Sequence, residues 1–312
     1  MKAKHFFAIT ALGAALFASC SNEEELATGS YPSDNLIRVT AGVNNDMTRS
    51  DEAVTPTSLT QNFSLTVVNN TNDNFSYANE IFSLNGTEWS CGKNLLWQNL
   101  STPVEIVALY PATPANTFSS VYSKENKSYG TITYGVKSNQ STADDANDLL
   151  LYHNASFEPA KDLQDGKLNI QFDHAFCRVD IEVTIGSEFN ANNGLAANPI
   201  QGIRVEGTKT TAEIGFSETA SPTITAKGDA ASITPTPGTF TSATSESDQA
   251  VARYSCIVIP QTAYLKVLLH TSDREFEWTG TKMALESGKQ YTLQLNMKKS
   301  ATARKFILRE RK

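Results

Sequence analysis

The sequence contains few of the residues from which catalytic and metal sites are commonly built. Its 312 residues include four histidines, four cysteines and three tryptophans. Cys-x-x-Cys pairs, His-Glu-x-x-His and Gly-x-Ser-x-Gly motifs and phosphate-binding glycine loops are all missing. A carboxylate pair for glycoside hydrolysis could still come from distant strands. We therefore predict no metal, no cofactor and no catalytic activity, and an enzyme is the least favoured class of function.

A basic stripe is missing as well. The formal net charge is −7. The basic residues that do cluster lie at the end of the chain: Arg304, Lys305, Arg309, Arg311 and Lys312. Because nucleic-acid-binding domains usually carry a basic patch on one face, the sequence predicts no nucleic-acid partner.

Long apolar runs are missing after the N-terminal segment. Residues 6–17 are almost wholly apolar and follow two lysines, but a membrane-spanning helix needs about 20 such residues. The run fits the core of a secretory signal peptide, and Ala18 and Ser19 are small enough for its cleavage site. Cys20 follows, at the position where bacterial lipoproteins carry diacylglycerol. We predict a signal peptide over 1–19 and a lipid on Cys20; the alternative is a plain signal peptide with a chance cysteine.

Three cysteines remain after Cys20, too few and too widely spaced for a disulfide framework. Cys91, Cys177 and Cys256 are odd in number and form no close pair. We expect them to be buried small apolar residues, with Cys177 and Cys256 as the one pair worth testing for a disulfide.

Most of the chain reads as β-strands joined by polar turns. Residues 20–35 are acidic and contain Gly and Pro, as a flexible tether would. Period-two alternation or continuous apolar character then predicts strands at 36–43, 63–67, 104–110, 179–185 and 291–297. No helix of convincing length is indicated. Many short strands separated by turns favour an all-β fold of β-sandwiches.

A composition change near residues 156–168 suggests a boundary between two domains. We place an N-terminal domain at 36–160, a C-terminal domain at 161–300 and a tail at 301–312, with 168–172 as the strand that opens the second domain. The polar segment 217–249 is interpreted as loops around weak strands; the alternative is a partly disordered insertion.

Two polar groups of residues invite a chemical interpretation. His174 follows Asp173, as in a catalytic pair, but a histidine that forms a hydrogen bond within a strand at a domain seam is the favoured interpretation. Asp144, Asp145 and Asp148 with Glu158 do not match the spacing of a known cation loop, so we expect a solvated acidic turn.

Six stretches, taken together, resemble the fimbrillin-like proteins of Bacteroidetes. In order, they read LLW (95–97), EIVALYP (105–111), DLLLY (148–152), FDHAFCRV (172–179), IPQT (259–262) and SGKQYTL (287–293). Their order and spacing agree with the family over about residues 36–298. Gln98, Ala112 and Phe176 depart from the usual residues at their positions.

This resemblance implies an all-β fold of two tandem transthyretin-like Greek-key β-sandwich domains. It also implies a subunit of a type V pilus, carried as a lipoprotein to the cell outer membrane and exposed on its surface. The residues after Cys20, Ser21-Asn22-Glu23-Glu24, resemble the acidic signal of such surface lipoproteins. Partners implied are other pilin subunits, a membrane through the lipid on Cys20, and a ligand on a host or bacterial surface.

The resemblance also suggests residues for strand exchange. In the family, an arginine-specific protease removes the first strand, and a strand of another subunit takes its place by β-strand addition. Here that strand would be 36–43, with Ile37, Val39, Ala41 and Val43 on one face. The cleavage would fall between Arg49 and Ser50; the alternative is an ordinary loop arginine.

The short tail leaves the position in the pilus open. Phe306, Ile307 and Leu308 are candidate residues of a donor strand, but the tail is shorter than in stalk subunits and could be a disordered end. It favours a tip, accessory or anchor subunit. The alternative function is an outer-membrane lipoprotein that binds a glycan or host ligand without polymerising.

Overall fold

The protein is almost entirely β-sheet, as the sequence predicts. The computed structural model describes residues 31–44, 59–114, 118–142, 144–191, 193–218 and 220–299, together with the backbone of 307–311. Cys20, Arg49, Ser50 and Phe306 lie outside these residues. Within the described part, no helix has the length and apolar character needed to cross a membrane.

Seven strands close into a barrel around the first hydrophobic core. Their order around the barrel is β1-β10-β9-β5-β2-β3-β4. The strands are β1 (Val39–Val43), β2 (Phe63–Val68), β3 (Tyr77–Asn85), β4 (Glu88–Ser90), β5 (Val104–Tyr110), β9 (Leu150–Phe157) and β10 (Leu168–His174). Phe63 lies at the centre of the core, where its ring contacts those of Phe82, Trp89 and Phe172.

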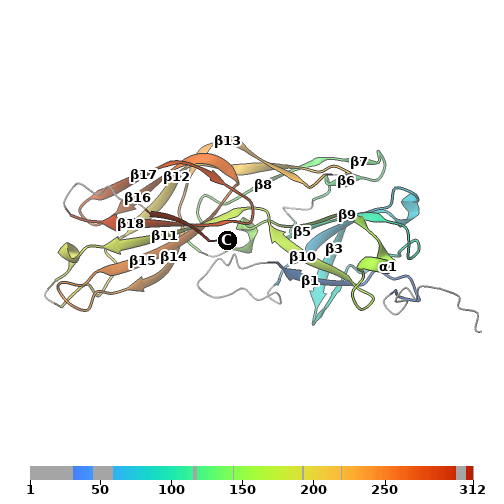
Figure 1. Ribbon diagram of the computed structural model, residues 1–312, viewed down its shortest axis with the longest axis horizontal. Helices are drawn as coiled ribbons and strands as arrows, with labels where there is room; N and C mark the ends of the chain where they lie inside the picture. Colours follow the sequence, from blue (N-terminus) through green and yellow to red (C-terminus); the bar gives the residue numbers. More distant parts are fainter. Residues whose placement is uncertain are drawn as a thin grey trace, which may run out of the picture.

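Two further sheets enclose the second hydrophobic core (Figure 1). The first has the order β14-β15-β11-β18-β19, and the second β13-β12-β16-β17. The strands of the first are β11 (Cys177–Ile185), β14 (Thr236–Thr241), β15 (Ala250–Val258), β18 (Gln290–Met297) and β19 (Ile307–Arg311). Those of the second are β12 (Gly202–Gly215), β13 (Thr223–Ile233), β16 (Gln261–His270) and β17 (Glu275–Leu285).

The remaining elements are short. They are the strands β6 (Tyr122–Ser123), β7 (Ser128–Tyr129) and β8 (Thr131–Gly135), the helix α1 (Pro159–Asp162), and the 3-10 turns η1 (Asp73–Phe75), η2 (Asp145–Asn147) and η3 (Ser187–Phe189). The four-residue α1 agrees with the expectation that no long helix forms.

The strand 168–172, which we expected to open the second domain, lies in the first core instead. It forms β10, and Leu168, Ile170 and Phe172 are buried inside the barrel. The chain also visits the second core early, because Phe118 and Tyr134 belong to that core although they precede β9. Hydrophobic alternation predicts that a strand exists but not which sheet it joins, so a boundary based on composition misses this crossing. The division into two domains stays a prediction.

Strand β12 changes its neighbour along its length. Its residues 202–206 pair with β16, and its residues 211–215 pair with β8 on the same edge. Gly207 lies between these stretches with φ +93°, and a Cβ there would lie 2.1 Å from the carbonyl oxygen of Tyr264. Glycine is therefore required where β12 changes its neighbour. In Figure 1, β8 and β13 extend from the second core over the outer face of β5 and β9.

A buried polar cluster fixes the β6–β7 hairpin to the outer face of the barrel. Glu105 on β5 is 3% exposed; its Oε2 accepts a short hydrogen bond from the Tyr129 hydroxyl, and its Oε1 lies 3.0 Å from His153 Nε2. Burial and the bond to Glu105 raise the pKa of Tyr129, so its hydroxyl remains protonated and donates. The cluster thus satisfies a carboxylate that the fold has removed from water.

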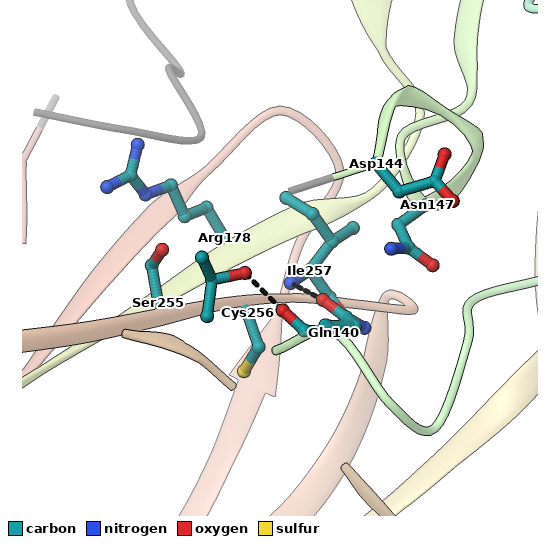
Figure 2. Close-up of a pocket in the computed structure, with 8 residues that line it drawn as sticks. Gln140, Asp144, Asn147, Arg178, Ser255, Cys256 and Ile257 are labelled. Atoms are coloured by element: carbon teal, nitrogen blue, oxygen red, sulfur yellow. Dashed lines mark hydrogen bonds between the residues drawn. The ribbon is translucent and has the colours of Figure 1, made fainter. Parts of the chain in front are cut away.

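Gln140 links β15 to the segments that follow β8 and β13 (Figure 2). Gln140 accepts a hydrogen bond from Ile257 N–H at 2.9 Å and donates to Ile257 C=O at 2.9 Å and to Lys137 C=O at 3.1 Å. Its backbone N–H also donates to Thr234 C=O at 2.8 Å. The side chain thereby continues the edge pairing of β15 beyond the start of β14.

Replacing Gln140 with alanine should lower the free energy of unfolding by about 2–4 kcal/mol, because both backbone groups of Ile257 lose their buried partner. Chemical denaturation of Gln140→Ala measures the loss. Gln201→Ala is the control: this side chain is exposed, and its removal should cost less than about 0.5 kcal/mol. Equal losses in both variants would contradict the role given to Gln140.

Replacing Tyr129 with phenylalanine should destabilise the protein by about 1–3 kcal/mol, since Glu105 Oε2 loses its donor. Tyr122→Phe is a matched control on the same hairpin. The two rings contact each other at 5.1 Å, but only Tyr129 donates to Glu105. Thermal unfolding of both variants tests the difference, and a Tyr122→Phe loss as large as that of Tyr129→Phe would refute it.

Candidate functional site

The first strand closes the barrel, and its two edges are paired very differently. Residues 39–43 of β1 pair in parallel with residues 168–172 of β10 without interruption. Hydrogen bonds flank this ladder: Leu168 N–H donates to Arg38 C=O at 2.8 Å, and Asn44 N–H donates to Phe172 C=O at 2.7 Å. On the other edge, β1 pairs with β4 only at Val39 and Trp89. The barrel therefore depends on β10 to hold β1.

Pairing begins before β1, within the segment we expected to be a tether. Trp97 N–H donates to Asn35 C=O and Ile37 N–H donates to Leu95 C=O, both at 2.8 Å. Tyr31 also packs against the first core. Residues 31–35, which we expected to belong to the tether, thus include contacts with the barrel.

The side chains predicted to lie on one face of the first strand do so. Ile37 and Val39 are buried in the first core, at 8% and 6% exposure, and Ala41 and Val43 are half-buried against it. Burying one such Val or Ile contributes on the order of 1.5–3 kcal/mol. Removing the strand would therefore expose both an apolar groove and an unpaired backbone edge.

The tail residues also form a strand. Residues 307–311 make β19, which pairs antiparallel with residues 290–294 of β18 and is the last strand of its sheet. Ile307 and Leu308 thus lie beside the chain's own β18. Their predicted role as donor residues stays a prediction.

Other strands at sheet ends have interrupted pairing. The ladders of β13, β14 and β17 each contain a register shift. Pro237 interrupts β14, Gly228 has φ +75° in β13, and Gly280 in β17 leaves room for the Trp278 ring, which a Cβ would meet at 2.7 Å. Such interruptions discourage edge-to-edge pairing. By contrast, the ladders of β1 with β10 and of β19 with β18 contain no register shift.

Two of the polar residues singled out from the sequence, His174 and Asp148, contact each other. His174 Nδ1 lies 2.8 Å from Asp148 Oδ2, and both side chains are buried, whereas Asp173 is exposed. This places His174 on β10 with a hydrogen-bond partner, as the favoured interpretation expects, but with a different aspartate. No group of three His, Cys, Asp or Glu residues in the described part could hold a metal.

The cavity beside Gln140 has room for about one water molecule (Figure 2). Its accessible volume is about 10 Å³, and it is lined in part by Asn147, Arg178, Ser255 and Cys256. Arg178 Nε donates a hydrogen bond to Asp180 Oδ1 at 2.6 Å. A space of this size suits a bridging water and not a substrate.

The three cysteines of the described part are free: Cys177 and Cys256 are buried in the second core, whereas Cys91 is half-buried. Cys177 faces Val258 and Cys256 faces Val179 on neighbouring strands, so the two thiols are diagonal rather than opposite. Burial raises the pKa of Cys256 to about 12, and it raises that of Cys177 as well. Both thiols therefore stay protonated and unreactive near neutral pH.

No sequence pattern pointed to Gln140 or to the cluster of Glu105, Tyr129 and His153. Gln140 stands alone in a polar loop, and the members of the cluster are far apart in the chain. The one unusual feature in the sequence is that the charged Glu105 adjoins an apolar run, in EIVALYP.

Solved structures from Bacteroides share the fold of this chain. A proposed cell adhesion protein from Bacteroides uniformis is 16% identical, with a TM-score of 0.57, and the match covers 90% of this chain and 98% of that one. A proposed cell adhesion protein from Bacteroides ovatus is 13% identical, with a TM-score of 0.55 and coverage of 89% and 96%. A fimbrial protein from Bacteroides vulgatus is 16% identical, with a TM-score of 0.50 and coverage of 88% and 97%.

Sequence comparison gives the family directly. No curated protein matches the chain. The sequence model of a family described as fimbrillin-like matches residues 42–306, which is most of the chain and begins inside β1. The protein belongs to the fimbrillin-like family.

Proposed function

We propose that the protein is a surface-exposed structural or adhesive subunit of a pilus, assembled by strand exchange at the barrel. In this proposal β1 leaves the barrel and a strand of another subunit pairs with β10 in its place. Membership of the fimbrillin-like family and the fold shared with a fimbrial protein support an appendage subunit. The observation that carries the exchange is the geometry of β1: a strand near the start of the described chain whose pairing with β10 is uninterrupted.

The position of Arg49 suits such an exchange. In the sequence, Arg49 comes after Asn44, whose N–H still donates to Phe172 C=O, and before Leu59, which is buried in the first core. Cleavage after Arg49 would separate β1 from the rest of the barrel without cutting a described strand. The replacement strand would restore the backbone hydrogen bonds and refill the apolar groove.

Delivery to the cell outer membrane would depend on the lipid on Cys20. Acyl chains each contribute about 0.8 kcal/mol per buried CH₂, so two or three chains give stable anchoring. The tether would hold the subunit at the surface until Arg49 is cleaved, or permanently in an anchor subunit.

The pairing of β19 with its own β18 favours a tip, accessory or anchor subunit over a stalk subunit. A stalk subunit would have to release this strand in order to donate it. The same pairing supports the second candidate, an outer-membrane lipoprotein that binds a glycan or host ligand without polymerising.

Protein purified from the cell surface should begin at Ser50, and Arg49→Ala should leave the N-terminus at lipidated Cys20. N-terminal sequencing and mass spectrometry distinguish the two. SDS-resistant ladders should disappear in Arg49→Ala and persist in Arg38→Ala, a control arginine that forms an exposed ion pair with Asp34. Wild-type surface protein that polymerises while still beginning at Cys20 would contradict cleavage at Arg49.

Val39→Ala should destabilise the uncleaved protein by about 1–3 kcal/mol, because it removes buried methyl groups from the first core. It should leave the assembled form unchanged, since β1 is no longer there. Unfolding of both forms in denaturant gives the comparison, with exposed Thr40→Ala as the control. An equal loss in the precursor and in the assembled form would show that β1 stays in the barrel.

A further inference from the structure

Most of the exposed large apolar side chains of the described part lie on the barrel or its loops. Five such residues are exposed in the described part: Ile81, Leu84, Leu96, Leu100 and Tyr264. All except Tyr264 belong to the barrel or its loops. Leu96 and Leu100, at 37% and 41% exposure, lie in the loop between β4 and β5.

Leu96 and Leu100 lie at the end of the barrel where the described chain begins. Leu96 forms a bridge with Leu36, and its N–H donates to the hydroxyl of Tyr77 at 2.9 Å. Leu100 C=O accepts from Ala160 N–H in α1 at 2.7 Å. In Figure 1, α1 and the blue start of the described chain lie at the same end of the molecule, away from β14 and β15.

The length of chain before Tyr31 sets how far this end can be from a lipid on Cys20. The eleven steps of chain from Cys20 to Tyr31 span at most about 40 Å when fully extended. A bilayer that holds the acyl chains would therefore lie within that distance of Tyr31, whereas the second core lies on the far side of the barrel (Figure 1). The end that carries Leu96 and Leu100 is the one that the tether keeps near lipid.

We propose that Leu96 and Leu100 form a membrane-contacting surface that docks the barrel end on the bilayer while the lipid on Cys20 is in place. This proposal rests on the lipid anchor proposed above. Two leucines contribute weakly by themselves, but the anchor makes their contact intramolecular and raises the effective lipid concentration. Apolar side chains of this kind enter the boundary between headgroups and acyl chains.

The surroundings of the two leucines favour lipid over a second protein copy. Neighbouring side chains are amides that already form hydrogen bonds: Asn69 Nδ2 donates to Gln98 Oε1 at 2.8 Å, and Asn99 Oδ1 accepts from the N–H of Ser101 at 2.9 Å. A stable protein interface buries about 800 Å² per partner. Two half-exposed leucines within an amide rim offer far less apolar area than that, but they suffice for an anchored surface contact.

A fluorophore at position 100 tests the proposal in the full lipidated chain. The variant Leu100→Cys, with half-buried Cys91 replaced by serine, carries an environment-sensitive dye; Cys177 and Cys256 are buried and do not react. Tyr264→Cys in the same background is the control, because Tyr264 is 59% exposed and lies in the second core's sheet. Both labelled proteins are bound to vesicles of phosphatidylethanolamine and phosphatidylglycerol, and the dye emission is recorded. The comparison is the emission of the same proteins in detergent-free solution after enzymatic removal of the acyl chains.

We expect dye emission at position 100 to shift to the blue and rise about twofold on vesicles, with no change at position 264. Unchanged emission at position 100 while the protein sediments with vesicles would overturn the docking surface and leave the lipid anchor standing. Failure to sediment at all would remove the anchor, and the docking proposal with it. A concentration-dependent shift without vesicles would identify a contact between copies and would also overturn the proposal.

Discussion

The pairing of β1 with β10 is the interaction on which the rest of the barrel depends. Strand β1 pairs with β10 over five residues, from Val39 to Val43, but it meets β4 at a single residue pair. A closed barrel has no free edge. Loss of β1 would leave the edge of β10 that faces it unpaired and would expose Ile170 and Phe172 to water. A replacement strand is therefore strongly favourable.

The second core packs together residues from distant parts of the chain. Residues from β5 and from the segment around β8 pack into it, and β12 pairs with β8 as well as with β16. Gln140 and the Glu105 cluster satisfy buried polar groups where the layers meet. Exchange of β1 could therefore proceed on one side of the barrel while the attachment of the opposite face to the second core remains intact.

Strand positions were largely predictable, whereas strand partners were not. Alternation located Ile37 to Val43 and Val179 to Ile185 because one face of each strand is buried. The boundary inferred from composition assigned 168–172 to the second domain, whereas Leu168, Ile170 and Phe172 lie in the first core, because neither composition nor alternation carries information on strand pairing. Gln140 was missed for a different reason: a loop amide that replaces backbone hydrogen bonds has no sequence pattern. The proposed processing and lipid sites came from resemblance and local motifs, and they lie outside the described residues.

The strand beside β10 in the assembled protein tests the central claim most directly. Electron cryomicroscopy of fibres from the cell surface would trace the chain that pairs with residues 168–172. The proposed exchange predicts that this strand belongs to a different subunit and that its alternate side chains occupy the positions of Val39 and Ala41. Finding residues 39–43 of the same chain still paired with β10 within the fibre would contradict it.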